Sequence, residues 1–178
     1  LLNKHFSNWE GSPAQALSAI TQPVPSDKML EVIPMDKHQA LVQWVRLGPS
    51  RHDEDYTALL VLNHMLGGGG FGSRLMEEIR EKRGLVYGVY SYFQPLETLG
   101  AYTIRLQTRA DQAAEAEAVL KAVLQTLVNG DISQDDLDKS KTNLMGGFAQ
   151  RMDSNGERAG LLAMMGIYHR PLGYLQNW

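Results

Sequence analysis

Four consecutive glycines, Gly67 to Gly70, separate two stretches of helical periodicity near the middle of the chain. A glycine inside a helix costs about 1 kcal/mol relative to alanine. We therefore expect the helix over residues 56–66 to end where the glycines begin, and a second helix to cover residues 71–82. The run permits a tight reversal with positive φ. One glycine normally suffices at a helix end, so four indicate either a mobile loop or the close approach of another backbone.

The same glycines precede a helix N-terminus, where free backbone N–H groups can bind an anion. A phosphate-binding P-loop ends in Gly-Lys-Ser/Thr, whereas Gly72 is followed here by Ser73 and Arg74. The dinucleotide-binding loop follows a strand, whereas a helical pattern precedes these glycines. The sequence therefore argues against nucleotide binding and leaves a structural role and a ligand-binding role both open.

Alternating and apolar segments around these helices indicate a sheet. Strands are expected over residues 29–33, 40–47, 85–93 and 101–107, the last two forming a hairpin. The strand over residues 40–47 has apolar side chains on both faces, which predicts a central position with helices on one side. Further helices are expected over residues 111–128, 133–152 and 154–170, and a proline-containing linker over residues 21–26. Strands joined by hairpins with helices segregated beside them predict an α+β fold with a largely antiparallel sheet.

The composition excludes several classes of partner. The chain has 178 residues, and 17 lysines and arginines against 20 aspartates and glutamates give a net charge of −3. Without a basic excess, neither nucleic acid nor an anionic membrane is an expected partner. No apolar run approaches the roughly 20 residues that span a bilayer. The absence of cysteine excludes disulfides, thiolate zinc ligands and thiol nucleophiles. The length fits one domain with one sizeable core.

The histidines do not form a recognisable metal motif. None is part of a His-Glu-x-x-His or a His-x-x-Glu-His sequence; the five are His5, His38, His52, His64 and His169. Residues 52–55 (HDED) combine potential ligands, but acidic residues are favoured at a helix N-terminus by the helix dipole alone. We therefore expect no metal site and no complete catalytic site within this chain.

Arg80 and Tyr87 are a third candidate for a functional site, after the glycine run and the histidines. Arg80 lies near the end of an expected helix, Tyr87 near the start of a strand, and Gly84 between them. Such a turn could bring a guanidinium and a phenol together, and the pair could then bind a peptide carbonyl or carboxylate. The alternative is that Arg80 is a solvated ion-pair partner of Glu77 on a charge-rich helix.

Two ordered blocks carry a resemblance to a known family: residues 62–75 (LNHMLGGGGFGSRL) and 79–87 (IREKRGLVY). They resemble the later, non-zinc domain of the pitrilysin, insulysin and mitochondrial processing peptidase family, the inverzincin zinc metallopeptidases. The resemblance extends more loosely from Phe6 and Trp9 through the three C-terminal helical segments, so it covers nearly the whole chain.

The resemblance implies an arrangement of two similar α+β domains per subunit, with zinc held by His-x-x-Glu-His and a downstream Glu in the first domain of the catalytic half. Two halves close around a peptide substrate. Arg80 and Tyr87 match the family's pair that holds the peptide near the zinc, and Gly67 to Gly70 match a flexible loop implicated in substrate access. The strand near Met29 could pair with an extended peptide by β-augmentation. No role is carried over to Arg83.

By the same resemblance, zinc and the catalytic groups belong to a complementary domain or subunit, and the bacterial periplasm or cytoplasm is the expected compartment. The family's domain has further strands and helices at both ends, so residues 1–178 are expected to be a single domain that is truncated at both ends. The alternative function is a non-catalytic scaffold or assembly subunit that retains the peptidase fold. A His-x-x-Glu-His sequence upstream of Leu1 or in a neighbouring gene would favour the peptidase.

Overall fold

The computed structural model describes residues 2–8, 10–11 and 28–176. The expected linker over residues 21–26 and Trp9 lie outside the described residues. Contacts divide the chain into two units, Leu1–Glu31 and Val32–Trp178. The first contains a short helix, α1 (Leu2–Phe6). The second contains the sheet, the remaining described helices and the candidate residues Gly67 to Gly70, Arg80 and Tyr87.

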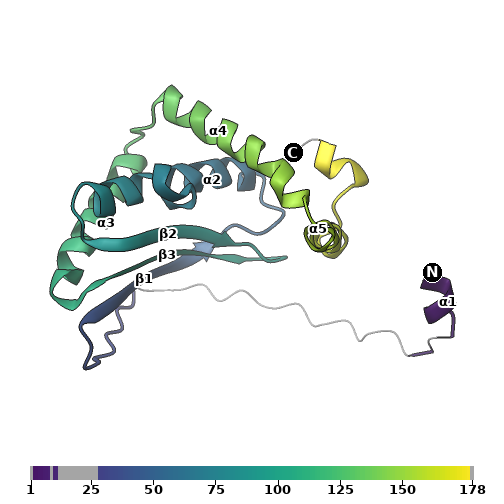
Figure 1. Ribbon diagram of the computed structural model, residues 1–178, viewed down its shortest axis with the longest axis horizontal. Coiled ribbons are helices and arrows are strands. Elements are labelled where there is room, and N and C mark those ends of the chain that lie inside the picture. The colour runs from purple at the N-terminus through teal and green to yellow at the C-terminus, as the bar shows by residue number, and fades with distance from the viewer. Residues whose placement is uncertain (1, 9, 12–27, 177–178) are drawn as a thin grey trace. The chain divides into compact units, whose positions relative to one another are not determined.

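The sheet of the second unit has three antiparallel strands in the order β1-β3-β2, drawn as arrows in Figure 1. They are β1 (Gln39–Gly48), β2 (Val86–Gln94) and β3 (Gly100–Arg109). The expected hairpin is confirmed, because β2 and β3 pair with each other. The central position predicted for residues 40–47 is wrong among the described strands, since β3 is central. The apolar side chains on the second face of β1 lie on an open face, where Leu41 is 53% and Val45 57% exposed.

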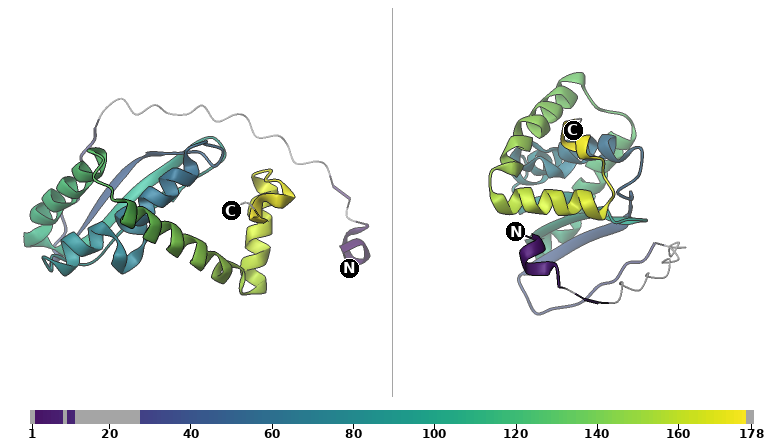
Figure 2. Two further views of the ribbon diagram at one scale, coloured as in Figure 1. Left: turned by 90° about the horizontal axis from the view of Figure 1, so that it is seen from above. Right: turned by 90° about the vertical axis from the view of Figure 1, so that its right-hand side faces the viewer.

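Helices cover the other face of the sheet. The longer ones are α2 (Tyr56–Asn63), α3 (Ala113–Val128), α4 (Gln134–Phe148) and α5 (Asn155–Ile167). In Figure 1, α2 and α3 lie next to the sheet and α4 packs on the far side of α2. Figure 2 shows that α5 turns away from the direction of α4. This arrangement confirms the α+β class, with helices on one side of an antiparallel sheet.

Single helical turns connect these elements. Two are π-helical, η1 (His64–Gly68) and η3 (Met76–Glu81). The others are 3₁₀ turns: η2 (Gly70–Gly72), η4 (Ala110–Gln112), η5 (Ala149–Met152) and η6 (Leu172–Gln176). The expected end of the first helix at Leu66 is wrong, because η1 continues α2 by one wider turn through Gly67 and Gly68.

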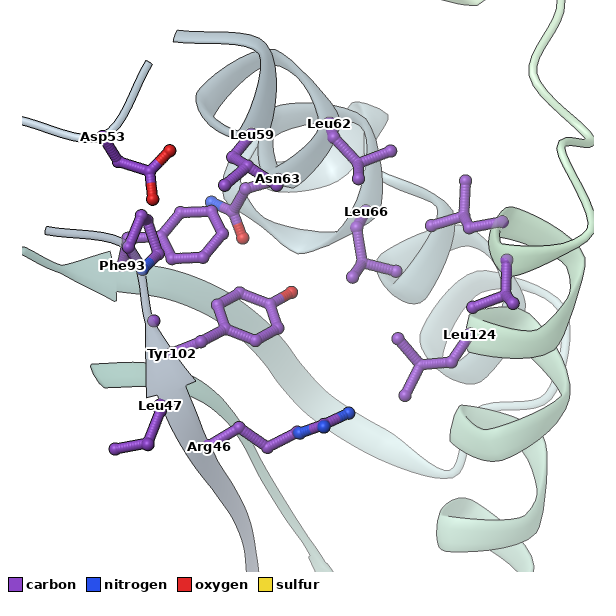
Figure 3. Close-up of a pocket in the computed structure, with 14 residues that line it drawn as sticks. Arg46, Leu47, Asp53, Leu59, Leu62, Asn63, Leu66, Phe93, Tyr102 and Leu124 are labelled. Atoms are coloured by element: carbon purple, nitrogen blue, oxygen red, sulfur yellow. The ribbon is translucent and has the colours of Figure 1, made fainter. Parts of the chain in front are cut away.

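The core lies between the sheet and these helices. Three apolar side chains of the segment expected as the second helix, Leu75, Met76 and Ile79, are buried there. They pack with Val89, Leu106 and Leu120. A mostly apolar cavity of about 490 Å³ adjoins the core between α2, α3 and the sheet. Figure 3 shows Phe93 and Tyr102 rising from the sheet beneath Leu59 and Leu66. Burial raises the pKa of Tyr102, so its phenol stays neutral at ordinary pH.

The strand expected over residues 29–33 is absent, although these residues are described. Their backbone has no strand assignment, and the large apolar side chains there and at Met35 are 68–88% exposed. A strand needs a neighbour to accept its ladder of hydrogen bonds, and no described strand pairs with this segment. The proposed β-augmentation by a strand near Met29 therefore has no structural basis here.

Candidate functional site

A tight turn after η3 brings the two predicted site residues together. Gly84 has φ +62°, and its N–H donates to the carbonyl of Arg80 at 2.8 Å. The N–H of Leu85 donates to the carbonyl of Ile79 at 3.0 Å. The first bond is that of an αL C-cap, in which glycine takes the left-handed position that other residues disfavour, and the second bond reaches one residue further back along η3. The chain therefore reverses directly from the last turn of η3 into β2.

An irregularity in β2 then exposes Tyr87 beside Arg80. The pairing of β2 with β3 shifts register between Val86 and Gly88, which leaves Tyr87 as the extra residue of a bulge. Bulges of this kind re-aim a side chain, often next to a functional site. Tyr87 is 89% exposed, and the Cζ atom of Arg80 lies 5.8 Å from the centre of its ring.

A second aromatic ring, which the sequence analysis did not single out, completes this group. Phe71, in the short η2 turn, is 71% exposed, and its ring centre lies 4.8 Å from Cζ of Arg80. We call Phe71, Arg80 and Tyr87 the Arg80 cluster. Cation–π contacts at this range are worth about 0.5–1 kcal/mol each at exposed sites. The two contacts hold the guanidinium at the surface between two exposed rings.

Arg80, Lys82 and Arg83 each have a carboxylate partner, and Arg80 differs from the other two in its aromatic contacts. Arg80 pairs with Glu81 rather than with Glu77. Lys82 and Arg83 both contact Glu78, at 2.5 and 2.6 Å. Hydrogen bonds from Lys82 and Arg83 hold the pKa of Glu78 below its usual value, so this carboxylate stays charged. Lys82 and Arg83 are thus engaged on the helix itself, and the cation that contacts the aromatic rings is Arg80.

The glycine run has a local structural explanation at each of its four positions. A Cβ added at Gly67 would lie 2.6 Å from Oγ and 2.9 Å from the backbone nitrogen of Ser91, and both are too close. Similar contacts at 2.6–2.7 Å, with residues of the preceding helical turn, exclude side chains at Gly68 and Gly69. Gly70 has φ +63°. Close approach of another backbone, one of the alternatives left open by the sequence, therefore explains Gly67, whereas Gly68 and Gly69 are crowded by their own helical turn.

Gly67 can approach β2 because a buried polar pair fixes the distance between η1 and this strand. The Nδ2 of Asn63 donates to the carbonyl of Ser91 at 3.1 Å, and the Oγ of Ser91 donates to Oδ1 of Asn63 at 2.7 Å. Both side chains are buried. This pair was not predicted from the sequence, although a lone amide near the glycines on an apolar helix was an available signal. The bonds attach the end of α2, four residues before Gly67, to β2.

The described residues do not provide a donor set for zinc. No group of three or more His, Asp or Glu side chains comes close enough among them to hold a metal ion. His52 contacts only one carboxylate, that of Glu97, at 3.3 Å. Burial, and secondarily the charge of Arg151, lowers the pKa of His64.

No described helix is long and apolar enough to cross a membrane.

Comparison with known proteins identifies the family. The sequence profile of the peptidase M16 inactive domain matches residues 1–144. The chain belongs to this family. The M16 inactive domain is the non-zinc domain to which the resemblance pointed, so that prediction is confirmed.

Relatives of this M16 inactive domain include proteins named as zinc proteases. The zinc protease PqqE of Helicobacter pylori is 28% identical over 167 residues, covering 92% of this chain and 37% of that protein. The uncharacterized zinc protease YmxG of Bacillus subtilis is 35% identical over 107 residues, covering 60% of this chain and 26% of that protein. The chain thus spans well under half the length of these relatives.

Solved structures share the fold. A peptidase M16 inactive domain from Pseudomonas fluorescens is 41% identical, with a TM-score of 0.73 over 79% of this chain and 33% of that one. A Helicobacter pylori protease has a TM-score of 0.79 over 96% of this chain and 42% of that one, at 24% identity. Both support the helix-covered antiparallel sheet described above.

Proposed function

We propose that this M16 inactive domain binds a peptide at the Arg80 cluster and positions it for hydrolysis by a zinc site in another domain or subunit. The observation that carries the proposal is the position of the Arg80 guanidinium, held between the exposed rings of Phe71 and Tyr87.

The chemistry of the cluster suits an extended peptide. A guanidinium has five N–H donors in a planar fork and accepts no hydrogen bond, so it matches carbonyl and carboxylate oxygens. The Tyr87 hydroxyl can donate or accept a further bond, and the two rings offer apolar surface to a peptide side chain. Gly67 to Gly70 contribute indirectly, because they fix the backbone directly before Phe71.

The partner in this proposal is a complementary domain or subunit that carries the zinc, which would supply the Lewis acid for hydrolysis. The names of the relatives support this partner, since YmxG of Bacillus subtilis and PqqE of Helicobacter pylori are called zinc proteases. We propose that residues 1–178 form most of one domain of such a protein, in the bacterial periplasm or cytoplasm. A structural neighbour, PqqL of Escherichia coli, is described as a periplasmic protease.

A second candidate function is a scaffold that keeps the fold without cleaving peptides. One relative favours it: the protein named non-peptidase homolog YmxG of Helicobacter pylori is 33% identical over 91 residues. Such a protein would assemble with a partner through this domain and would not need a peptide at the Arg80 cluster. The two functions predict different results for substitutions in the Arg80 cluster. Peptide binding or cleavage should change if the domain positions a peptide, and should stay the same if it is a scaffold.

The exchange Tyr87→Phe tests the peptidase function. Loss of one hydroxyl bond to the peptide is expected to lower kcat/KM for casein cleavage by the complete protein, with its zinc-bearing half, about tenfold. Tyr90→Phe is the matched control, because Tyr90 lies on the same strand, is 52% exposed and belongs to no part of the cluster. A wild-type cleavage rate for Tyr87→Phe, or an equal loss for both variants, would contradict a role for the Tyr87 hydroxyl in peptide binding.

A further inference from the structure

A second recess lies beside the Arg80 cluster, and the proposed function does not use it. Its volume is about 520 Å³. On one side it is lined by η1 and the glycine segment, with His64 and Phe71, and on the other by the end of α4 and the η5 turn, with Asn143 and Arg151. The recess therefore lies between the glycine segment and the last turns of α4.

The polar groups of this recess are suited to a negatively charged ligand. Arg151 contributes a guanidinium and Asn143 an amide, and both residues are exposed. Among the described residues that line it there is no aspartate or glutamate. The Nδ1 atom of His64 is buried without a hydrogen-bond partner among the described residues. Because its lowered pKa keeps this imidazole neutral, the ring can either donate or accept.

Phe71 joins the recess to the cluster. Its side chain lines the recess, and its ring is also the closer of the two that contact Arg80, at 4.8 Å. A peptide that lies across Phe71 to reach Arg80 and Tyr87 therefore passes the opening of the recess. One of its side chains can enter while its backbone stays at the cluster.

We infer that this recess binds the carboxylate side chain of an acidic residue in the peptide, and that Arg151 is the residue that determines this preference. The inference rests on the proposed function, since a peptide at the Arg80 cluster is what would bring a side chain to the recess. A charge-assisted hydrogen bond from an exposed arginine to a carboxylate is expected to favour a glutamate-containing peptide over its glutamine counterpart about tenfold.

The test is a binding experiment on the complete protein in the presence of a chelator, which prevents cleavage. Two sets of fluorescein-labelled peptides are compared by anisotropy: one carries a single glutamate at each position in turn, and the other carries glutamine at the same positions. Wild-type protein is expected to prefer glutamate at one position about tenfold. Arg151→Gln is expected to abolish this preference without weakening the glutamine set, and Arg151→Lys to retain part of it. Lys141→Gln is the matched control, because Lys141 is an exposed cation on α4 that does not line the recess.

The outcomes separate the recess from the cluster. Arg80→Ala should weaken both peptide sets alike. If Arg80→Ala changes neither set while Arg151→Gln still abolishes the preference, the proposed peptide position fails and the carboxylate recess stands. Absence of a glutamate preference in the wild type, or a preference that survives Arg151→Gln or is lost equally in Lys141→Gln, would overturn the inference.

Discussion

Replacing Arg80 with alanine is expected to lower kcat/KM for peptide cleavage by the complete protein about 100-fold, the largest functional effect that we expect from one substitution in this domain. Hydrogen bonds to a charged group contribute about 1.5–3 kcal/mol, and 1.4 kcal/mol corresponds to a factor of ten. The variant also removes the cation that the rings of Phe71 and Tyr87 hold in place. The measurement is casein cleavage at several substrate concentrations, with the zinc-bearing half present.

Two further variants show whether the position or merely the charge of Arg80 matters. Arg83→Ala removes an arginine three residues away, whose guanidinium is bound to Glu78. It should leave cleavage within about twofold of wild type, as expected for a surface ion pair. Arg80→Lys keeps the charge without the planar fork and should recover only part of the loss. Equal losses for Arg80→Ala and Arg83→Ala would indicate a general charge effect and contradict a specific role.

The exchange Gly67→Ala is expected to destabilise the domain by about 2–3 kcal/mol, because the new methyl group overpacks the contact between η1 and β2. The added Cβ would lie 2.6 Å from Oγ and 2.9 Å from the backbone nitrogen of Ser91. Relief requires movement of the strand or loss of the buried hydrogen bonds between Ser91 and Asn63. Urea denaturation followed by far-ultraviolet circular dichroism measures the change.

Gly72→Ala is the control for this stability prediction. Gly72 has no heavy atom within 4 Å of an added Cβ, and it is not among the residues with positive φ. Its replacement should therefore change the free energy of unfolding by less than about 0.5 kcal/mol, as for most surface substitutions. A neutral Gly67→Ala variant would mean that the glycine run tolerates side chains. The close approach of Ser91 would then not explain the glycine at position 67, and the alternative of a mobile loop would be favoured.

The local turn at Gly84 was accessible from the sequence. A charged helix that ends in a glycine and continues into an alternating, aromatic segment specifies a helix end, a left-handed residue and a strand. That information suffices to place Arg80 near Tyr87, and the structure brings them to 5.8 Å. The hairpin of β2 and β3 is likewise a local feature, and it was predicted correctly.

Features that depend on distant contacts were not accessible in the same way. The crowding at Gly67 comes from Ser91, 24 positions later in the chain, so helix propensity alone placed the helix end too early. The position of β1 depends on which strand occupies each side of β3, which its own apolar pattern does not encode. Phe71 and Arg151 were not predicted, because the contact of Phe71 with Arg80 and the recess that Arg151 lines both form between segments that are separate in the sequence.

Photo-crosslinking of a bound peptide tests the central claim, that a peptide lies at the Arg80 cluster, most directly. A peptide carrying a photoreactive benzoylphenylalanine is bound to the complete protein with a chelator present, irradiated, and located by mass spectrometry. The account predicts crosslinks within residues 68–90, around Phe71 and Tyr87, that disappear in Arg80→Ala. Crosslinks found only on other surfaces, such as the open face of β1 around Leu41, and unchanged by Arg80→Ala, would contradict it.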